Sequence, residues 1–140
     1  MKVLFPGSFN PFTIGHKNIV DRAVKLFDKV VVAVGVNSSK NVSPSEMAAC
    51  TEHIKKIYAS NPKVEVISYS TLTAQVVKEQ GIDAIIRGIR NSVDLEYENE
   101  ATRVNYTVFG VETIYMLADP ELKEVSSTMA RELHKYGVEI

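Results

Sequence analysis

The chain has 140 residues, of which 45% are hydrophobic and 24% are charged, with a formal net charge of −1. This length and composition suit one compact core, so we expect a single domain over residues 1–140. The near-neutral charge gives no general attraction to nucleic acid or to an anionic membrane, and we expect neither as a partner. The single cysteine, Cys50, excludes an internal disulfide and a cysteine-rich zinc site. Because no apolar run could span a bilayer or serve as a signal peptide, we expect a cytoplasmic protein.

Short apolar runs alternate with amphipathic segments along the whole chain. The predicted strands are Lys2–Phe5, Lys29–Val36, Val64–Ser68, Ala84–Ile86 and Glu112–Met116, and the segments between them are predicted to be helices. Because these strands are almost uniformly apolar, we expect both faces of each to be buried. This predicts an α/β fold with a single doubly wound, Rossmann-like domain, in which a five-stranded parallel sheet carries helices on both faces. The loop Asn37–Ser45 is predicted to be mobile, and ligands are expected at the carboxyl ends of the strands.

The first predicted strand leads through Pro6-Gly7 and small polar residues into a helix that is predicted to open at Gly15-His16. The unpaired backbone N–H groups of a first helical turn favour an anion, and His16 adds a donor there. Gly7 and Ser8 fit a phosphate site because one allows close backbone approach and the other offers a hydroxyl. The alternative is a structural turn with a surface histidine, which would be preferred for an isolated Gly-His pair.

Basic residues follow two other predicted strands. Lys40 lies on the polar loop after the second strand, and Arg87 and Arg90 flank Gly88 at the end of the fourth. A guanidinium binds phosphate oxygens bidentately, and Gly88 would leave the backbone open to a ligand. The alternatives are a solvated loop lysine and surface ion pairs between the arginines and the acidic residues of 94–100.

The last predicted strand is followed by Ser126-Ser127-Thr128 and a final helix. Such a helix start could hold a second phosphate group, although ordinary capping explains the residues equally well. His53 and His134 have no ligand-like spacing to each other or to the cysteine, so we expect both at the surface and no metal site built by the protein.

Together these residues resemble the phosphopantetheine adenylyltransferase family of the nucleotidyltransferase superfamily, which is marked by a T/H-x-G-H element. The similarity runs from Lys2 to about Arg131. It rests on Pro6–Pro11, Thr13–His16, Ile86–Arg90, Asp94–Glu98, Asn105 and Val125–Thr128. The Gly-His element identifies only the superfamily. The Arg-Gly-Ile-Arg and Asp-Leu-Glu-Tyr-Glu segments point to this family within it.

The resemblance implies an enzyme of coenzyme A biosynthesis that transfers the adenylyl group of ATP to 4′-phosphopantetheine by direct in-line attack, giving dephospho-coenzyme A and pyrophosphate. It also implies assistance by Mg²⁺, held mainly by substrate phosphates and water, and assembly as a homohexamer. The implied catalytic residues are His16, Lys40 and Arg90. The implied ATP site comprises Ser8, Phe9, His16, Gly88, Ile89, Arg90, Glu98, Leu122, Lys123, Glu124, Val125, Ser126, Ser127 and Thr128. The implied acceptor site comprises Ser8, Lys40, Thr73, Arg87 and Asn105.

Two alternatives stay open at this point. Another small-molecule nucleotidyltransferase of the superfamily, such as a nicotinamide-nucleotide adenylyltransferase or a cytidylyltransferase, would share the phosphate-binding residues and differ at the acceptor. A non-catalytic nucleotide-binding module is the other alternative, and the presence of His16, Lys40, Arg87 and Arg90 argues against it. These residues are donors and cations without a candidate nucleophile, as expected where catalysis rests on positioning and charge stabilisation.

The sequence also gives modest support for assembly. The apolar segment 106–109, expected after a helix at 98–105, and the run 115–118 offer more apolar surface than a small monomer usually exposes. An ordinary core is the competing interpretation.

Overall fold

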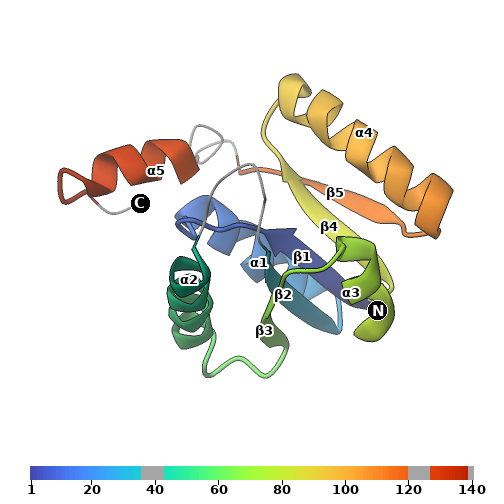
Figure 1. The fold of residues 1–140 in the computed structure, drawn as a ribbon, viewed down its shortest axis with the longest axis horizontal. Coiled ribbons are helices and arrows are strands. Elements are labelled where there is room, and N and C mark those ends of the chain that lie inside the picture. The colour runs from blue at the N-terminus through green and yellow to red at the C-terminus, as the bar shows by residue number, and fades with distance from the viewer. Residues whose placement is uncertain (36–42, 120–126, 139–140) are drawn as a thin grey trace.

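The computed structural model describes residues 1–35, 43–119 and 127–138. Strands and helices alternate along the described chain (Figure 1). Their bounds are β1 Lys2–Gly7, α1 Ile14–Leu26, β2 Lys29–Gly35, α2 Pro44–Ile57, β3 Val64–Tyr69, α3 Thr73–Glu79, β4 Ala84–Ile89, α4 Ser92–Phe109, β5 Thr113–Leu117 and α5 Ser127–His134. Among the described helices, none combines the length and apolarity that a membrane span requires.

The strands form one five-stranded sheet in the order β3-β2-β1-β4-β5, and every neighbouring pair is parallel. The predicted doubly wound α/β fold is therefore confirmed. The chain adds strands outward from β1 to β3 and then returns to place β4 on the other side of β1. The strand order thus reverses between β1 and β4, and a parallel sheet of this kind opens a ligand crevice at the carboxyl ends of those two strands.

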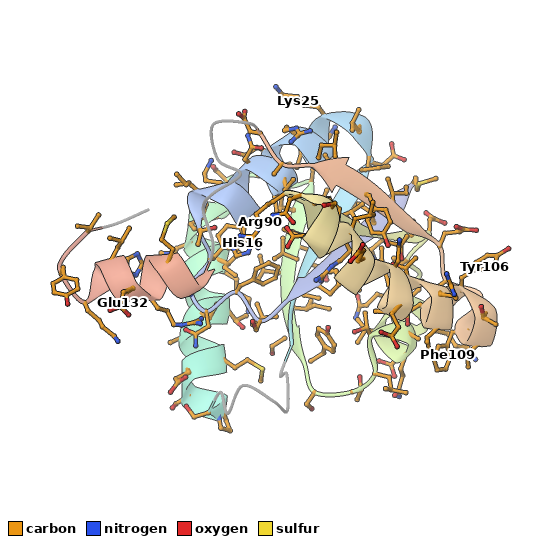
Figure 2. All side chains as sticks on the ribbon, turned by 90° about the horizontal axis from the view of Figure 1, so that it is seen from above. His16, Lys25, Arg90, Tyr106, Phe109 and Glu132 are labelled. Carbon is orange, nitrogen blue, oxygen red and sulfur yellow. The ribbon has the colours of Figure 1, made fainter. Side chains whose placement is uncertain are left out.

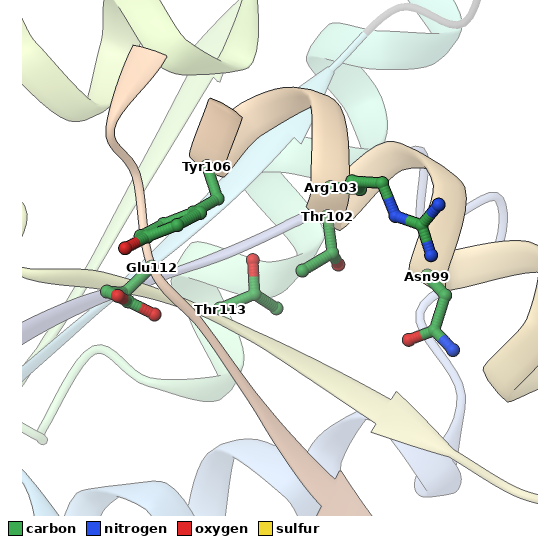
Figure 3. A pocket seen from close by; sticks show the side chains of 6 residues that line it. All are labelled: Asn99, Thr102, Arg103, Tyr106, Glu112 and Thr113. Atoms are coloured by element: carbon green, nitrogen blue, oxygen red, sulfur yellow. The ribbon is translucent and has the colours of Figure 1, made fainter. Parts of the chain in front are cut away.

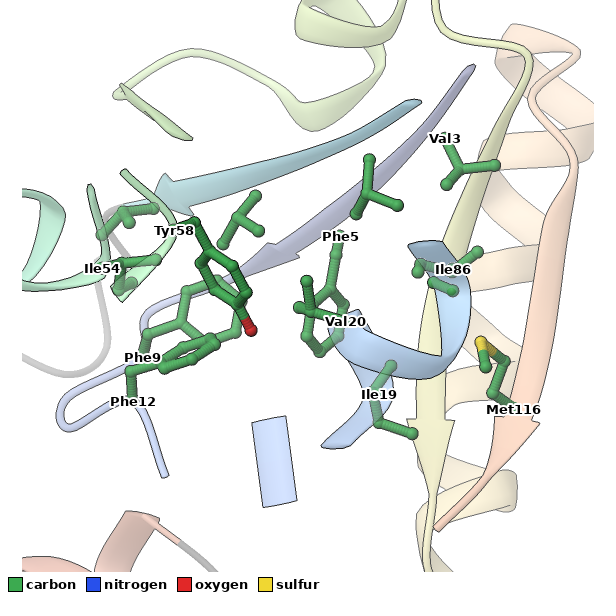
Figure 4. Close-up of a cluster of buried hydrophobic side chains, with 14 of the residues drawn as sticks. Val3, Phe5, Phe9, Phe12, Ile19, Val20, Ile54, Tyr58, Ile86 and Met116 are labelled. Atoms are coloured by element: carbon green, nitrogen blue, oxygen red, sulfur yellow. The ribbon is translucent and has the colours of Figure 1, made fainter. Parts of the chain in front are cut away.

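Helices cover both faces of the sheet. Ile19 and Val20 of α1 and Ile54 of α2 pack with Val3 and Phe5 in one buried cluster, which Figure 4 shows. The helix α3 packs on the opposite face through a second buried cluster. It contributes Ala74, Val76 and Val77, against Leu4, Val31, Ala33 and Ile85.

The fifth strand shows that α4 covers the same face as α3. Ile114 and Met116 belong to the cluster on the α1 side, so Tyr115 between them faces the other way. The Tyr115 hydroxyl donates to Thr102 Oγ1 at 2.7 Å and to Asn99 Oδ1 at 3.1 Å, both on α4.

Two strands extend further than the sequence predicts. The first strand continues through Pro6 and Gly7, which pair with Ala33 and Val34 of β2, instead of ending before them. The fourth strand continues to Ile89, which pairs with Leu117. The expectation that Arg87 and Gly88 follow the end of a strand is therefore wrong, because pairing with β5 holds both within β4.

Two helical boundaries also differ. Residues 106–109 are the last turn of α4 and do not follow a shorter helix, because the helix stops only at Gly110, whose φ of 67° is left-handed. The expected loop Asn37–Ser45 is partly helical, since Ser43 caps α2 and Pro44 begins it. Residues 36–42 lie outside the described residues.

Candidate active site

His16 lies in the first turn of α1, which begins one residue earlier than predicted. Thr13 is the N-cap, and its hydroxyl accepts a hydrogen bond from the His16 backbone N–H at 3.3 Å. In return, the Thr13 backbone N–H donates to His16 Nδ1 at 3.0 Å. Because Nδ1 is an acceptor here, the proton of the neutral imidazole is on Nε2. The start of α1 therefore combines helix N–H groups with an imidazole donor, as an anion site requires.

Three phenylalanine rings fix the orientation of the half-buried imidazole. The ring centroids of Phe9, Phe12 and Phe5 lie 5.0, 5.5 and 6.3 Å from that of His16. Figure 4 shows Phe9 and Phe12 at the end of the buried cluster, next to Tyr58. Apolar walls strengthen the electrostatic effect of an imidazole donor on any anion beside it.

The Ser8–Phe9 turn, which precedes α1, has a strained backbone. Phe9 has a φ of 46°, a left-handed conformation that costs a bulky residue about 1–3 kcal/mol. Its ring is seated over Gly7, where an added Cβ would lie 2.9 Å from the ring atoms. Gly7 therefore serves the packing of Phe9, and the turn presents the half-buried Ser8 at the crevice.

A side chain of α2 holds the same turn. Cys50 Sγ donates to the Phe9 carbonyl oxygen at 2.7 Å. Burial raises the pKa of the Cys50 thiol to about 11, so the group remains a protonated donor at neutral pH. Cys50 is a helix residue, as expected, but its contact with the predicted phosphate-binding turn follows only from the tertiary packing.

Arg87 and Arg90 have different surroundings. Arg87 Nη1 donates to the Pro6 carbonyl oxygen at 2.7 Å, which ties β4 to β1 at the point where the strand order reverses. Arg90 forms a bidentate ion pair with Asp94, with Nε–Oδ2 and Nη2–Oδ1 distances of 2.8 and 3.2 Å. Hydrogen bonds from Arg90 lower the pKa of the Asp94 carboxyl group. The alternative of an ion pair with the acidic run is therefore observed for Arg90. His16 and Arg90 are labelled in Figure 2.

Gly88 has a packing role that the sequence interpretation missed. A Cβ at this position would lie 3.2 and 3.3 Å from Cγ1 and Cδ1 of Ile19. The absence of a side chain at Gly88 therefore lets α1 approach β4 closely. The space beside Gly88 is occupied by this helix and is not open to a ligand. Ile89, the next residue, is buried.

Two of the predicted acceptor residues, Thr73 and Asn105, lie on different helices, α3 and α4. Thr73 opens α3 and is half-buried, and its hydroxyl lies 3.0 Å from the Tyr69 hydroxyl. Asn105 is half-buried in α4, roughly 20 Å along the helix from Ser92 at about 1.5 Å per residue.

Several predicted site residues fall outside the described part of the chain. These are Lys40 and the segment Leu122, Lys123, Glu124, Val125 and Ser126. Glu98 lies in α4, and Ser127 and Thr128 open α5, but their side chains are outside the description. His53 and His134 are exposed, as predicted.

Arg131 connects the last helix to the turn before α1. Its Nη1 donates to the Asn10 carbonyl oxygen, 121 positions earlier in the chain. Figure 1 shows α5 beyond the sheet rather than over either face. The hydrogen bond therefore joins the middle of α5 to the turn that precedes α1. The cationic residue within the last helix was visible in the sequence, but its partner was not.

The chain matches a known family and curated relatives in sequence. The model of the family described as cytidylyltransferase-like matches residues 4–133. A phosphopantetheine adenylyltransferase of Bacteroides thetaiotaomicron is 41% identical over 140 residues, which cover 99% of this chain and 91% of that protein. A protein of the same name from Leuconostoc citreum is 44% identical over 138 residues, which cover 97% of this chain and 85% of that protein.

Solved structures share the fold at low sequence identity. A bifunctional NMN adenylyltransferase/ADP ribose pyrophosphatase of Francisella tularensis matches with a TM-score of 0.66 at 13% identity, over 99% of this chain and 43% of that one. A lipopolysaccharide core biosynthesis protein of Thermoplasma volcanium matches with a TM-score of 0.60 at 18% identity, over 85% of this chain and 96% of that one. At these identities the likeness supports the fold alone.

Proposed function

Since this chain belongs to the cytidylyltransferase-like family and, within it, to the phosphopantetheine adenylyltransferases, we propose that it transfers the adenylyl group of ATP to 4′-phosphopantetheine. The products are dephospho-coenzyme A and pyrophosphate, which makes it an enzyme of coenzyme A biosynthesis. The observation that carries the proposal is the Thr13–His16 hydrogen bond at the N-terminus of α1, beside the point where the strand order reverses.

The nucleotide is proposed to bind with its α-phosphate near the start of α1. His16 Nε2–H and the helix N–H groups stabilise the negative charge that grows on that phosphate in the transition state. The turn at Ser8 and Phe9 contacts the phosphates in this proposal. Gly88, Ile89 and Arg90 line the nucleotide site with their backbone, because the Cβ side of Gly88 faces Ile19 and the Ile89 side chain is buried. Glu98 and residues 122–128 complete that site in the proposal.

The acceptor is proposed to bind with its terminal phosphate between Lys40 and Arg87. The Pro6 carbonyl oxygen fixes the Arg87 guanidinium at the carboxyl end of β1. A phosphate held there can attack the α-phosphorus directly, with pyrophosphate leaving on the opposite side. The arm of the acceptor then extends past Thr73 and Asn105.

Mg²⁺ is proposed to bind only as a complex with the nucleotide. Within residues 1–35, 43–119 and 127–138, no three His, Cys, Asp or Glu side chains are grouped as a protein-built metal site requires. Mg²⁺ with water and phosphate oxygens as its main ligands needs no such group, and it would neutralise phosphate charge.

The two rival functions are less well supported. A nicotinamide-nucleotide adenylyltransferase or a cytidylyltransferase would use the same phosphate site, but the relatives at about 40% identity carry the name phosphopantetheine adenylyltransferase. A non-catalytic binding module would not need the oriented His16 imidazole.

Assembly as a homohexamer and a cytoplasmic location are further parts of the proposal. Support for assembly comes from exposed apolar side chains on α4, namely Leu95, Val104, Tyr106, Val108 and Phe109. Figure 2 shows Tyr106 and Phe109 toward one end of this helix. A cavity of about 340 Å³ lies beside them, lined by Asn99, Thr102, Arg103, Tyr106, Glu112 and Thr113 (Figure 3). A second copy of the chain would cover this surface.

The decisive experiment measures pyrophosphate release in the presence of Mg²⁺ for three pairs of nucleotide and acceptor in parallel: ATP with 4′-phosphopantetheine, ATP with nicotinamide mononucleotide, and CTP with phosphocholine. We expect release with phosphopantetheine alone and dephospho-coenzyme A as the product. Release with either other acceptor instead would assign the chain to a different nucleotidyltransferase. Binding of ATP without release would favour the non-catalytic module.

A further inference from the structure

Tyr69 is the last residue of β3 and belongs to the face of the sheet that α3 covers. Ile67 and Tyr69 pack on the cluster that contains Ala74, Val76 and Val77 of α3. The Tyr69 hydroxyl oxygen lies 3.0 Å from Thr73 Oγ1, at the first residue of α3. A hydroxyl pair thus joins the end of one element to the start of the next, at the carboxyl edge of the sheet.

Gly35 makes this arrangement possible. It is the last residue of β2 and pairs with Tyr69 in the sheet register. A Cβ at Gly35 would lie 2.6 Å from Cζ and 2.8 Å from the hydroxyl oxygen of Tyr69. Any side chain at position 35 would therefore displace the Tyr69 ring and its hydroxyl. The absence of a Cβ at Gly35 keeps the phenol within reach of Thr73.

Arg87 lies on the same face as the hydroxyl pair. Ile85 belongs to the cluster on the α3 side and Ile86 to the cluster on the α1 side. Since side chains alternate along a strand, Arg87 points to the α3 side, as does Tyr69. The residue proposed to hold the acceptor phosphate and the Tyr69–Thr73 pair therefore share one face near the carboxyl edge.

A hydrogen-bonded hydroxyl pair has a defined chemistry. One hydroxyl donates to the other, so the proton of the second points outward and lone pairs remain as acceptors. Such a pair matches an amide, which offers one N–H donor and one carbonyl acceptor. The arm of 4′-phosphopantetheine contains two amides, whereas the phosphate end contains none.

We propose that Tyr69 is a positioning residue for the acceptor, whose hydroxyl holds the Thr73 hydroxyl where it meets an amide of the phosphopantetheine arm. The inference rests on the function proposed above. It assigns Tyr69 a part in acceptor specificity that is independent of the phosphate-binding residues. It also explains why position 35 must lack a side chain.

The test is a double-mutant cycle on steady-state kinetics. Tyr69→Phe keeps the ring over Gly35 and removes only the hydroxyl, and Thr73→Val removes the partner. We expect each single variant to raise KM for phosphopantetheine roughly three- to tenfold, as the loss of one hydrogen bond does. The kcat and the KM for ATP are expected to stay unchanged. Because Tyr69 acts through Thr73, the double variant should match Thr73→Val.

Two more variants separate this role from a structural one. Gly35→Ala is expected to raise the same KM, since the added Cβ displaces the phenol. Tyr58→Phe is the matched control, because its hydroxyl donates to Asp21 Oδ1 at 3.3 Å on the α1 side of the sheet. That variant should leave KM for phosphopantetheine unchanged. A thermal melt of each variant checks that the fold is retained.

Three outcomes would overturn the inference. The first is an unchanged KM in Tyr69→Phe when the wild-type chain turns over normally, which leaves the proposed function intact. The second is independent, multiplicative effects of the two substitutions, which would show that Tyr69 does not act through Thr73. The third is the absence of wild-type turnover with phosphopantetheine, which rejects the proposed function and this inference with it.

Discussion

The backbone N–H of Thr13 donates to Nδ1 of His16 at 3.0 Å, and this hydrogen bond determines which ring nitrogen carries the proton. The same two residues form the capping box of α1, since the Thr13 hydroxyl accepts from the His16 N–H. The Thr13–His16 pair therefore both starts the helix and orients the imidazole. A substitution at His16 therefore removes both the donor that is proposed to face the phosphate and one of the two capping hydrogen bonds.

We expect His16→Ala to lower kcat roughly 100- to 1,000-fold, because one oriented transition-state donor is lost. ATP binding should change little, since the helix N–H groups remain. Kinetics under conditions where chemistry limits the rate, with a calorimetric titration of ATP, checks both points. His53→Ala is the matched control, because His53 is an exposed histidine on α2. Wild-type turnover in His16→Ala would reject the assigned role.

Arg87→Lys should raise KM for phosphopantetheine while leaving KM for ATP close to the wild-type value. The substitution keeps the charge but loses the planar fork, which contacts the Pro6 carbonyl oxygen and is proposed to bind the acceptor phosphate bidentately. The KM of the same variant for ATP therefore serves as the internal reference. Equal increases in both KM values would mean that Arg87 supports the whole crevice and not the acceptor alone.

Gly88→Ala should lower the free energy of unfolding by roughly 1–3 kcal/mol, because the added methyl group overpacks the contact with Ile19. Urea titration of the wild type and the variant measures this change in the free energy of unfolding. In an Ile19→Ala background the contact atoms are absent, so the same substitution should cost much less. An equal cost in both backgrounds would show that the close approach of α1 to β4 does not explain the glycine.

Alkylation of Cys50 by iodoacetamide should accelerate about tenfold per pH unit from pH 7 to 9.5 without a plateau. Burial raises the pKa of this thiol to about 11, so most of it stays protonated and unreactive over this range. The small thiolate fraction, and with it the rate, grows tenfold with each pH unit. The chain unfolded in urea is the control, and its rate should level off above about pH 9. A plateau near pH 9 in the folded chain would contradict the buried Cys50–Phe9 contact.

The raised pKa of Cys50 also predicts a pH dependence of stability. The folded pKa lies above the unfolded value near 9, so the unfolded chain loses its proton first as the pH rises. The contribution of this group to stability is complete below about pH 9 and is lost between pH 9 and 11. Comparison of urea midpoints for wild type and Cys50→Ser isolates this effect from other alkaline titrations.

Light scattering at micromolar concentration should give a mass of at least a trimer. Val108→Asp is expected to reduce assembly, because Val108 is an apolar side chain of α4 that is 66% exposed. Leu26→Asp is the control, since Leu26 is similarly exposed at the end of α1. A wild-type mass near 15.5 kDa would show that the chain is a monomer and that the exposed side chains of α4 do not mediate assembly.

Much of the fold could be predicted from the sequence because burial leaves a local pattern. The uniformly apolar runs at 30–34 and 84–86 identify strands that are covered on both faces, and they are the core of β2 and β4. The glycine-rich break before His16 likewise marks the start of α1 to within one residue. These features depend on neighbours in the chain, so the order of residues is sufficient to indicate them. Whether His16, Arg87 and the other site residues have their assigned roles stays a prediction.

Only the tertiary structure decided what the site residues contact. Cys50 meets Phe9 across 41 positions, Arg131 meets Asn10 across 121, and the space beside Gly88 is filled by Ile19. Hydrophobic periodicity shows which side of a helix or strand is buried. It does not specify which other element covers that side, or at which residues the two elements make contact. Those contacts depend on the packing of helices against the sheet, where steric fit over a few tenths of an ångström selects one arrangement.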